Sequence, residues 1–155
     1  MTNGLNDVKL ELVDSVSAAE KFITWLGERR PYDAIAIDTE TGEREGRPRS
    51  DALSPWHGDL RLVQVGDGMT GWAIPWNEWG GVFYEAMNKF DGQIVCHNIA
   101  FEAKWFEIRS RWRMPWHRAH DTMIMAQLLD PLGSGALKKL TSQYVDSKAA
   151  ALQTH

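Results

Sequence analysis

The chain has 155 residues, a formal net charge of −4 and 43% hydrophobic residues. This size and composition are typical of one compact globular domain and exclude a disordered or collagen-like chain. No segment approaches about 18 consecutive apolar residues, and the N-terminus has no basic stretch before an apolar one, so neither a membrane span nor a signal peptide is expected. The single cysteine, Cys96, excludes an internal disulfide and suits a reducing, cytoplasmic location.

The first predicted elements are a helix and a buried strand. Ser17 opens a capping-box pattern, which predicts a helix that begins there and ends by Pro31. Residues 34–37 are apolar at every position, as expected of a central strand that is covered on both faces.

A hairpin, a helix and another strand follow. The segments 60–68 and 71–74 predict two paired strands, because the Asp-Gly pair at 67–68 supplies the positive φ of a tight turn. Helical spacing of apolar residues predicts a helix over 79–90, and residues 93–96 predict a short buried strand.

The last third of the sequence is predicted to be mainly helical. One helix begins near Asn98 and, after a short strand, Asp121 is the expected N-cap of a second helix that stops at the Asp-Pro pair 130–131. Residues 137–144 form one more helical stripe. This alternation of strands and helices predicts an α/β fold in a single domain over residues 1–155.

Asp38 and Glu40 are the first candidate metal ligands. Alternate residues of a strand point to the same side, so both carboxylates reach one point if the extended backbone continues to residue 40. Carboxylates without neighbouring His or Cys ligands suit Mg²⁺ or Mn²⁺. The alternative is that Asp38 opens a turn and Glu40 is solvated.

Glu102 is the third candidate, within the segment CHNIAFEAKWF at 96–106. On a helix it shares a face with Asn98, four residues earlier. Its aromatic neighbours make an unpaired carboxylate costly to desolvate, so Glu102 needs a partner. A cation held by the two strand carboxylates is one candidate, and an ion pair with Lys104 or Arg109 is the other.

Four motifs in this order resemble the 3′-to-5′ exonuclease domains of the DnaQ-like (DEDD) superfamily: DTE, H-N-x-x-F-E, HDTMIMAQLLDP and GALKKLTSQYV. The likeness is closest to the proofreading domain of family A DNA polymerases (DNA polymerase I) of bacteria and phages. It implies an RNase H-like α/β/α sandwich with a five-stranded mixed sheet. It also implies a location in the bacterial cytosol, a bacterial or phage-encoded chain, and a polymerase domain C-terminal to this one.

The resemblance implies a two-metal phosphodiesterase that removes nucleotides from the 3′ end of single-stranded or frayed DNA. Asp38, Glu40 and Glu102 then bind the Mg²⁺ or Mn²⁺ ions and are catalytic. The family usually has Asp where Glu102 stands, so we expect reduced or retuned activity. The side chains that would contact the substrate are Thr39, Thr41, His97, Asn98 and Phe101.

The third motif of the family, a late Asp with a Tyr four or a His five residues before it, has no counterpart here. Tyr144 is followed four residues later by Lys148, and Asp146 is too close to it. The domain is therefore expected to be truncated before this motif. Two alternatives stay open: a nuclease-like module without turnover that binds 3′ ends or packs on a polymerase, and an RNA exonuclease similar to RNase D.

The connection over residues 42–59 is long for a compact domain, and such loops are often functional. It follows the proposed metal ligands, so contacts with substrate phosphates are one hypothesis, while a solvated loop is the interpretation that the sequence favours. Its basic and aromatic residues are Arg44, Arg47, Arg49, Trp56 and His57. A second basic stretch, residues 109–113, has the same two interpretations, contacts with substrate phosphates or a solvated segment.

Overall fold

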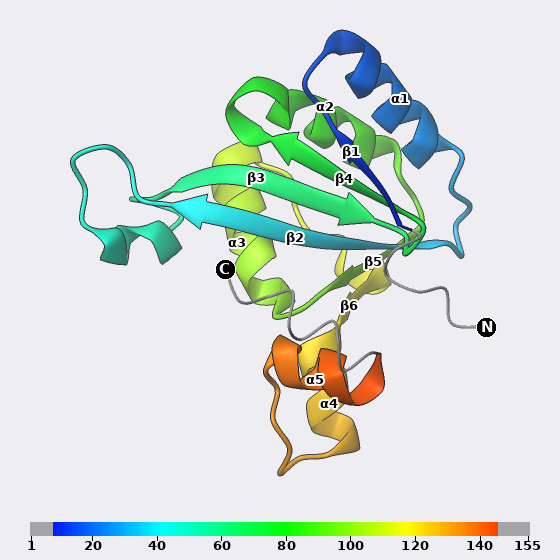
Figure 1. The fold of residues 1–155 in the computed structure, drawn as a ribbon, viewed down its shortest axis with the longest axis vertical. Coiled ribbons are helices and arrows are strands. Elements are labelled where there is room, and N and C mark those ends of the chain that lie inside the picture. Colours follow the sequence, from blue (N-terminus) through cyan, green and yellow to red (C-terminus); the bar gives the residue numbers. More distant parts are fainter. Residues whose placement is uncertain (1–7, 146–155) are drawn as a thin grey trace.

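The computed structural model describes residues 8–145, which form one six-stranded mixed sheet and five α-helices (Figure 1). The strands are β1 (Lys9–Leu12), β2 (Ala34–Gly42), β3 (Asp59–Gly66), β4 (Thr70–Pro75), β5 (Gln93–Cys96) and β6 (Ala119–Asp121). The helices are α1 (Val16–Gly27), α2 (Trp76–Lys89), α3 (Ile99–Ser110), α4 (Thr122–Leu129) and α5 (Leu137–Tyr144), with short 3-10 helices η2 (Arg49–Leu53) and η3 (Trp116–Arg118). The predicted α/β class is confirmed, as is the predicted order of elements from α1 onward, whereas β1 was not predicted.

The strand order in the sheet is β1-β4-β3-β2-β5-β6. Strands β3 and β4 form the predicted antiparallel hairpin, with Gly68 at φ 85° in its turn. Strand β2 is antiparallel to β3 and parallel to β5, which in turn is parallel to β6. The carboxyl ends of β2, β5 and β6 therefore point in the same direction, and β2 continues to Gly42, beyond the ends of β5 and β6. The sheet has six strands instead of the expected five because β1 pairs with β4 in parallel.

The main core lies between the sheet and helices α1, α2 and α3, which cover the same face (Figure 1). Along β2, Ile35 and Ile37 are buried in this core, whereas Ala34 and Ala36 are exposed. The prediction that residues 34–37 are covered on both faces is therefore wrong. These three helices pack against only one side of β2, and alanine tolerates both environments.

Two helix boundaries differ from the prediction. The N-cap of α1 is Ser15, whose side chain accepts a hydrogen bond from the backbone N–H of Ala18 at 3.3 Å, and Ser17 lies within the helix. Helix α2 begins at Trp76, directly after β4. Within residues 8–145, no helix has the length and hydrophobicity that crossing a lipid bilayer requires.

Candidate functional site

Strand β2 remains extended through Gly42, so it presents Asp38 and Glu40 on the same side of the sheet. Both are exposed there, while Thr39 between them is 7% exposed and faces the helices. Although Asp38 as a whole residue is exposed, partial burial of its carboxyl group raises its pKa above the ordinary value, against the opposing effects of the Thr39 backbone and the charge of His97. The backbone is therefore extended through residue 40, which is the condition for the carboxylates of Asp38 and Glu40 to reach one point.

Glu102 lies in the first turn of α3 and is 2% exposed. One carboxylate oxygen, Oε1, accepts a hydrogen bond from the Thr39 hydroxyl at 3.3 Å. The other, Oε2, is buried and has no hydrogen-bond partner among residues 8–145. Burial, together with the negative charges of Asp38 and Asp121, raises the pKa of Glu102 to about 7. Its carboxyl group is therefore only partly ionised at neutral pH.

The predicted ion pair of Glu102 with Lys104 or Arg109 is absent from the described part of the chain. Arg109 lies near the other end of α3, where it contacts Asp59 instead. Thr39 from β2 is the partner of Glu102, which ties α3 directly to the strand that carries the other two carboxylates.

Asp121 caps two helices at once. As predicted, its side chain accepts a hydrogen bond from the first turn of α4, at 2.9 Å from the backbone N–H of Met123. It also accepts, at 3.0 Å each, from the backbone N–H groups of Asn98 and Ile99 at the start of α3. Asn98 has φ 65°, a left-handed conformation that Asn tolerates better than most residues. Asp121 therefore fixes the start of the helix that carries Glu102.

A groove of about 680 Å³ runs along the open face of the sheet beside Asp38. Small residues of neighbouring strands, such as Ala36 and Gly66, contribute to its lining. His97 also lines the groove, and its Nδ1 lies 3.0 Å from the hydroxyl of Thr122. The groove therefore places a histidine and a carboxylate along one accessible surface.

The other predicted substrate contacts lie around this region with different exposure. Asn98 is exposed, whereas Thr41 and Phe101 are half-buried. The ring of Phe101 packs 6.1 Å from that of Trp105, measured between centroids. The predicted absence of a third motif rests on Asp146 and Lys148, which lie outside the described residues.

The donor chemistry of Asp38, Glu40 and Glu102 fits a hard divalent cation, because all three offer carboxylate oxygens and Glu102 Oε2 is unpaired within residues 8–145. The side chains do not form a closed cage. No group of three or more His, Cys, Asp and Glu residues in the described range is arranged as a metal-binding cluster. The residues fit Mg²⁺ or Mn²⁺ by chemical type, with ligand positions that must adjust on binding.

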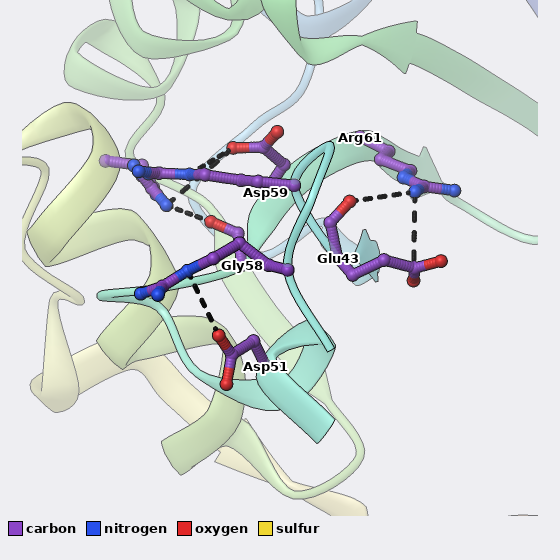
Figure 2. Close-up of polar contacts among 8 residues, drawn as sticks. Glu43, Asp51, Gly58, Asp59 and Arg61 are labelled. Carbon is purple, nitrogen blue, oxygen red and sulfur yellow. Dashed lines mark hydrogen bonds and ion pairs between the residues drawn. The ribbon is translucent and has the colours of Figure 1, made fainter. Parts of the chain in front are cut away.

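The long connection after β2 is more ordered than a solvated loop. It contains η2, and its basic residues form ion pairs: Arg44 with Asp59 at 2.9 Å and Arg47 with Asp51 at 3.3 Å (Figure 2). Both arginines thus contact a carboxylate in this structure, and the hypothesis that they bind phosphates stays a prediction. In the second basic stretch, Trp112 is 5% exposed and belongs to the core.

No protein-family model matches the sequence, and the curated proteins contain no significant match to it. The structure is similar to the catalytic core of RRP6 from Trypanosoma brucei, with a TM-score of 0.72 and 17% identity, over 92% of this chain and 36% of that one. It is also similar to Escherichia coli RNase D, described as an exoribonuclease involved in structured RNA processing, with a TM-score of 0.65 and 17% identity, over 89% of this chain and 34% of that one.

A third similar structure is Brucella melitensis NrnC bound to pGG, with a TM-score of 0.62 and 19% identity, over 90% of this chain and 61% of that one. NrnC is also described with bound Mg²⁺. The chain spans about a third of the length of the RRP6 and RNase D chains. At these identities the likeness concerns the fold, and it shows that this chain has the RNase H-like α/β fold of these proteins.

Proposed function

We propose that this chain is a metal-dependent 3′-to-5′ exonuclease domain of the DnaQ-like superfamily. The observation that carries the proposal is the position of Glu102, buried next to β2 with an oxygen that has no hydrogen-bond partner among the described residues. A buried carboxyl group with a raised pKa beside other carboxylates is typical of a functional site. The fold that the chain shares with RNase D and NrnC supports the same function.

In this proposal Asp38, Glu40 and Glu102 hold Mg²⁺ or Mn²⁺. When bound, such cations lower the pKa of a water ligand and stabilise the leaving 3′-oxygen of a phosphodiester. The chain's own contribution is positional: β2 directs two carboxylates to the open side, and the Thr39 hydroxyl orients Glu102.

The terminal nucleotide would lie beside the same edge of the sheet. Asn98, exposed at the start of α3, would bond the sugar, and the half-buried ring of Phe101 would stack with the base. Thr41 and His97 flank these residues on β2 and after β5. Their hydroxyl and imidazole groups are suited to contacts with the phosphate or the ribose.

We propose RNA, ahead of DNA, as the substrate of this chain. RNase D is described as an exoribonuclease, whereas none of the three similar proteins reported above is described as a DNA polymerase. A proofreading role on a DNA 3′ end, next to a C-terminal polymerase domain, stays a prediction from the sequence motifs. A direct comparison of the two nucleic acids separates these functions.

The test is digestion of 5′-labelled RNA and DNA 12-mers of equal sequence with Mg²⁺, Mn²⁺ or EDTA. We expect the wild-type chain to shorten the RNA stepwise from its 3′ end with either metal and EDTA to stop the reaction. Asp38→Asn should lower the rate at least about a hundredfold, because it removes a metal ligand. Glu20→Gln, which neutralises an exposed carboxylate on α1, is the matched control and should retain full activity.

Unchanged activity of Asp38→Asn would refute the assignment of the site. Binding of the oligonucleotides without shortening would favour the second candidate, a nuclease-like module that binds 3′ ends. That candidate has one observation in its favour, since residues 8–145 contain no closed cluster of three metal ligands.

A further inference from the structure

The connection between β2 and β3 folds into an ordered arm, defined here as residues 43–58. Helix η2 forms its outer part, and the Ser54 carbonyl accepts hydrogen bonds from the backbone N–H groups of His57 at 3.1 Å and Gly58 at 2.7 Å. Gly58 is buried, and a side chain there would meet the carbonyl oxygens of Asp51 and Gly42. The arm thus has a defined backbone path.

Ion pairs and a hydrogen bond connect this arm to β3 and α3. The guanidinium of Arg109, from α3, donates to the Gly58 carbonyl and approaches the same Asp59 carboxylate that pairs with Arg44. Figure 2 labels Gly58 and Asp59, and its dashed lines mark these contacts. A further pair, Arg61 with Glu43 at 3.9 Å, lies on the other side of the arm. Two guanidinium groups share the Asp59 carboxylate, so among residues 8–145 the base of the arm carries one positive charge more than this carboxylate balances.

The arm presents two large apolar side chains to solvent. Trp56 is 69% exposed and Leu53 is 72% exposed. The indole of Trp56 takes part in none of the ring contacts found among residues 8–145, whereas Trp72, Trp105 and Trp112 are buried in the core. Arg49, on η2, forms no ion pair within the described range. An exposed indole and a free guanidinium on an ordered arm are the components of a stacking platform for single-stranded nucleic acid.

We propose that the arm binds the nucleotides that precede the 3′ end of a single-stranded substrate, with one base stacked on Trp56. Arg49 and the shared charge of Arg44 and Arg109 would contact the phosphates. The arm begins three residues after Glu40, at the carboxyl end of β2, which continues beyond the ends of β5 and β6 in the same direction. A strand whose last nucleotide lies at the carboxylates would reach the arm only if it is several nucleotides long.

This inference rests on the proposed exonuclease function and gives it a dependence on substrate length. The test compares a 12-mer RNA with the dinucleotide pGG as substrates for Trp56→Ala. We expect the KM for the 12-mer to rise about tenfold with little change in kcat, because stacking on one aromatic ring is lost. The kinetics on pGG should remain unchanged, and Trp56→Phe should restore most of the affinity for the 12-mer.

The matched control is Trp116→Ala. Trp116 is 62% exposed, but it lies at the amino end of β6, on the opposite edge of the sheet from the carboxylates. Its replacement should leave both substrates unaffected. Equal kinetics of wild type and Trp56→Ala on the 12-mer would overturn the proposal, as would an equal loss on both substrates.

A binding measurement in EDTA, where no cleavage takes place, tests the arm independently of catalysis. The anisotropy of a fluorescein-labelled 12-mer in EDTA should show weaker binding to Trp56→Ala than to wild type. If the wild-type chain binds the 12-mer through Trp56 but cleaves neither substrate, the arm proposal stands and the exonuclease proposal fails. If wild type and Trp56→Ala bind equally, or the wild type does not bind, the arm proposal fails.

Discussion

Glu102 combines near-complete burial with incomplete hydrogen bonding in the described part of the chain. An ionised carboxylate in such a place is costly because protein groups do not replace all of its lost water. The same cost is expressed in its pKa of about 7, against an ordinary value of 4.5. The folded protein without metal therefore prefers Glu102 in its protonated form, and a cation would reverse that preference.

Glu102→Gln should therefore stabilise the metal-free protein at high pH. A folded-state pKa above the unfolded value means that the favourable effect of protonation is complete below about pH 4.5 and is lost as the pH rises through about 7. We expect the variant to exceed wild type by about 1–3 kcal/mol in free energy of unfolding at pH 8, and by little at pH 5. Urea denaturation in EDTA at both pH values measures this, with Glu20→Gln as control. A difference that does not depend on pH would contradict the explanation.

At the scale of elements, the start of α3 depends on a residue outside that helix. Its N-cap residue, Asn98, makes no side-chain capping bond, and the Asp121 carboxylate at the end of β6 takes over this role. The same carboxylate caps α4. The orientation of Glu102 thus depends on the pairing of β6 with β5, because that pairing places Asp121.

Asp121→Asn should impair the site more than it impairs the fold. The Asn side chain keeps one acceptor oxygen for the backbone N–H groups of Asn98 and Met123, but the amide group that replaces Oδ2 cannot accept from the backbone N–H of Ile99. We expect a loss of about 1–2 kcal/mol in stability and a decrease in kcat that exceeds the change in KM. Ser15→Ala is the comparison variant, because it removes the cap of α1 and should cost about 1 kcal/mol with no change in kcat. Equal kcat values for Asp121→Asn and wild type would contradict a positioning role.

The elements that were predicted well carry local signals, and those that were missed do not. The turn at Gly68 and the cap of α4 are specified within a few residues of sequence. Strand β1 has four residues and forms by pairing with β4, about 60 residues away in the chain, so periodicity alone does not reveal it. The contacts of Asp121 with Asn98 are likewise non-local. The sequence thus supplied the three carboxylates as candidates, which stays a prediction, while the partner of Glu102 and the open face of β2 required the structure.

For the whole molecule, the candidate site is a place where separate parts of the chain meet. Strand β2 supplies two carboxylates, α3 supplies the third, and β6 holds the start of α3 in place. A cation bound by β2 and α3 together would link these parts. Its binding free energy would then add to the stability of the folded state.

Mn²⁺ should therefore raise the melting temperature of the wild-type chain. At a metal concentration about a hundred times the Kd, the stabilisation is about 2.7 kcal/mol, which corresponds to roughly 5–10 °C for a domain of this size. Asp38→Asn should show little or no shift, whereas Glu20→Gln should behave like wild type. Differential scanning fluorimetry over a Mn²⁺ titration provides the measurement. An equal shift in Asp38→Asn would place the metal elsewhere.

The alternation of side chains along β2 also protects the sheet against mispairing. If β2 paired with β3 one residue out of register, Asp38 and Glu40 would turn toward the helices and Thr39 would turn to the open side. Two charges would then enter a layer built from rings such as Phe83 and Phe106, where no water compensates them. The same carboxylates that we assign to cation binding thus exclude the slipped pairing, so they have a role in folding even in a chain without turnover.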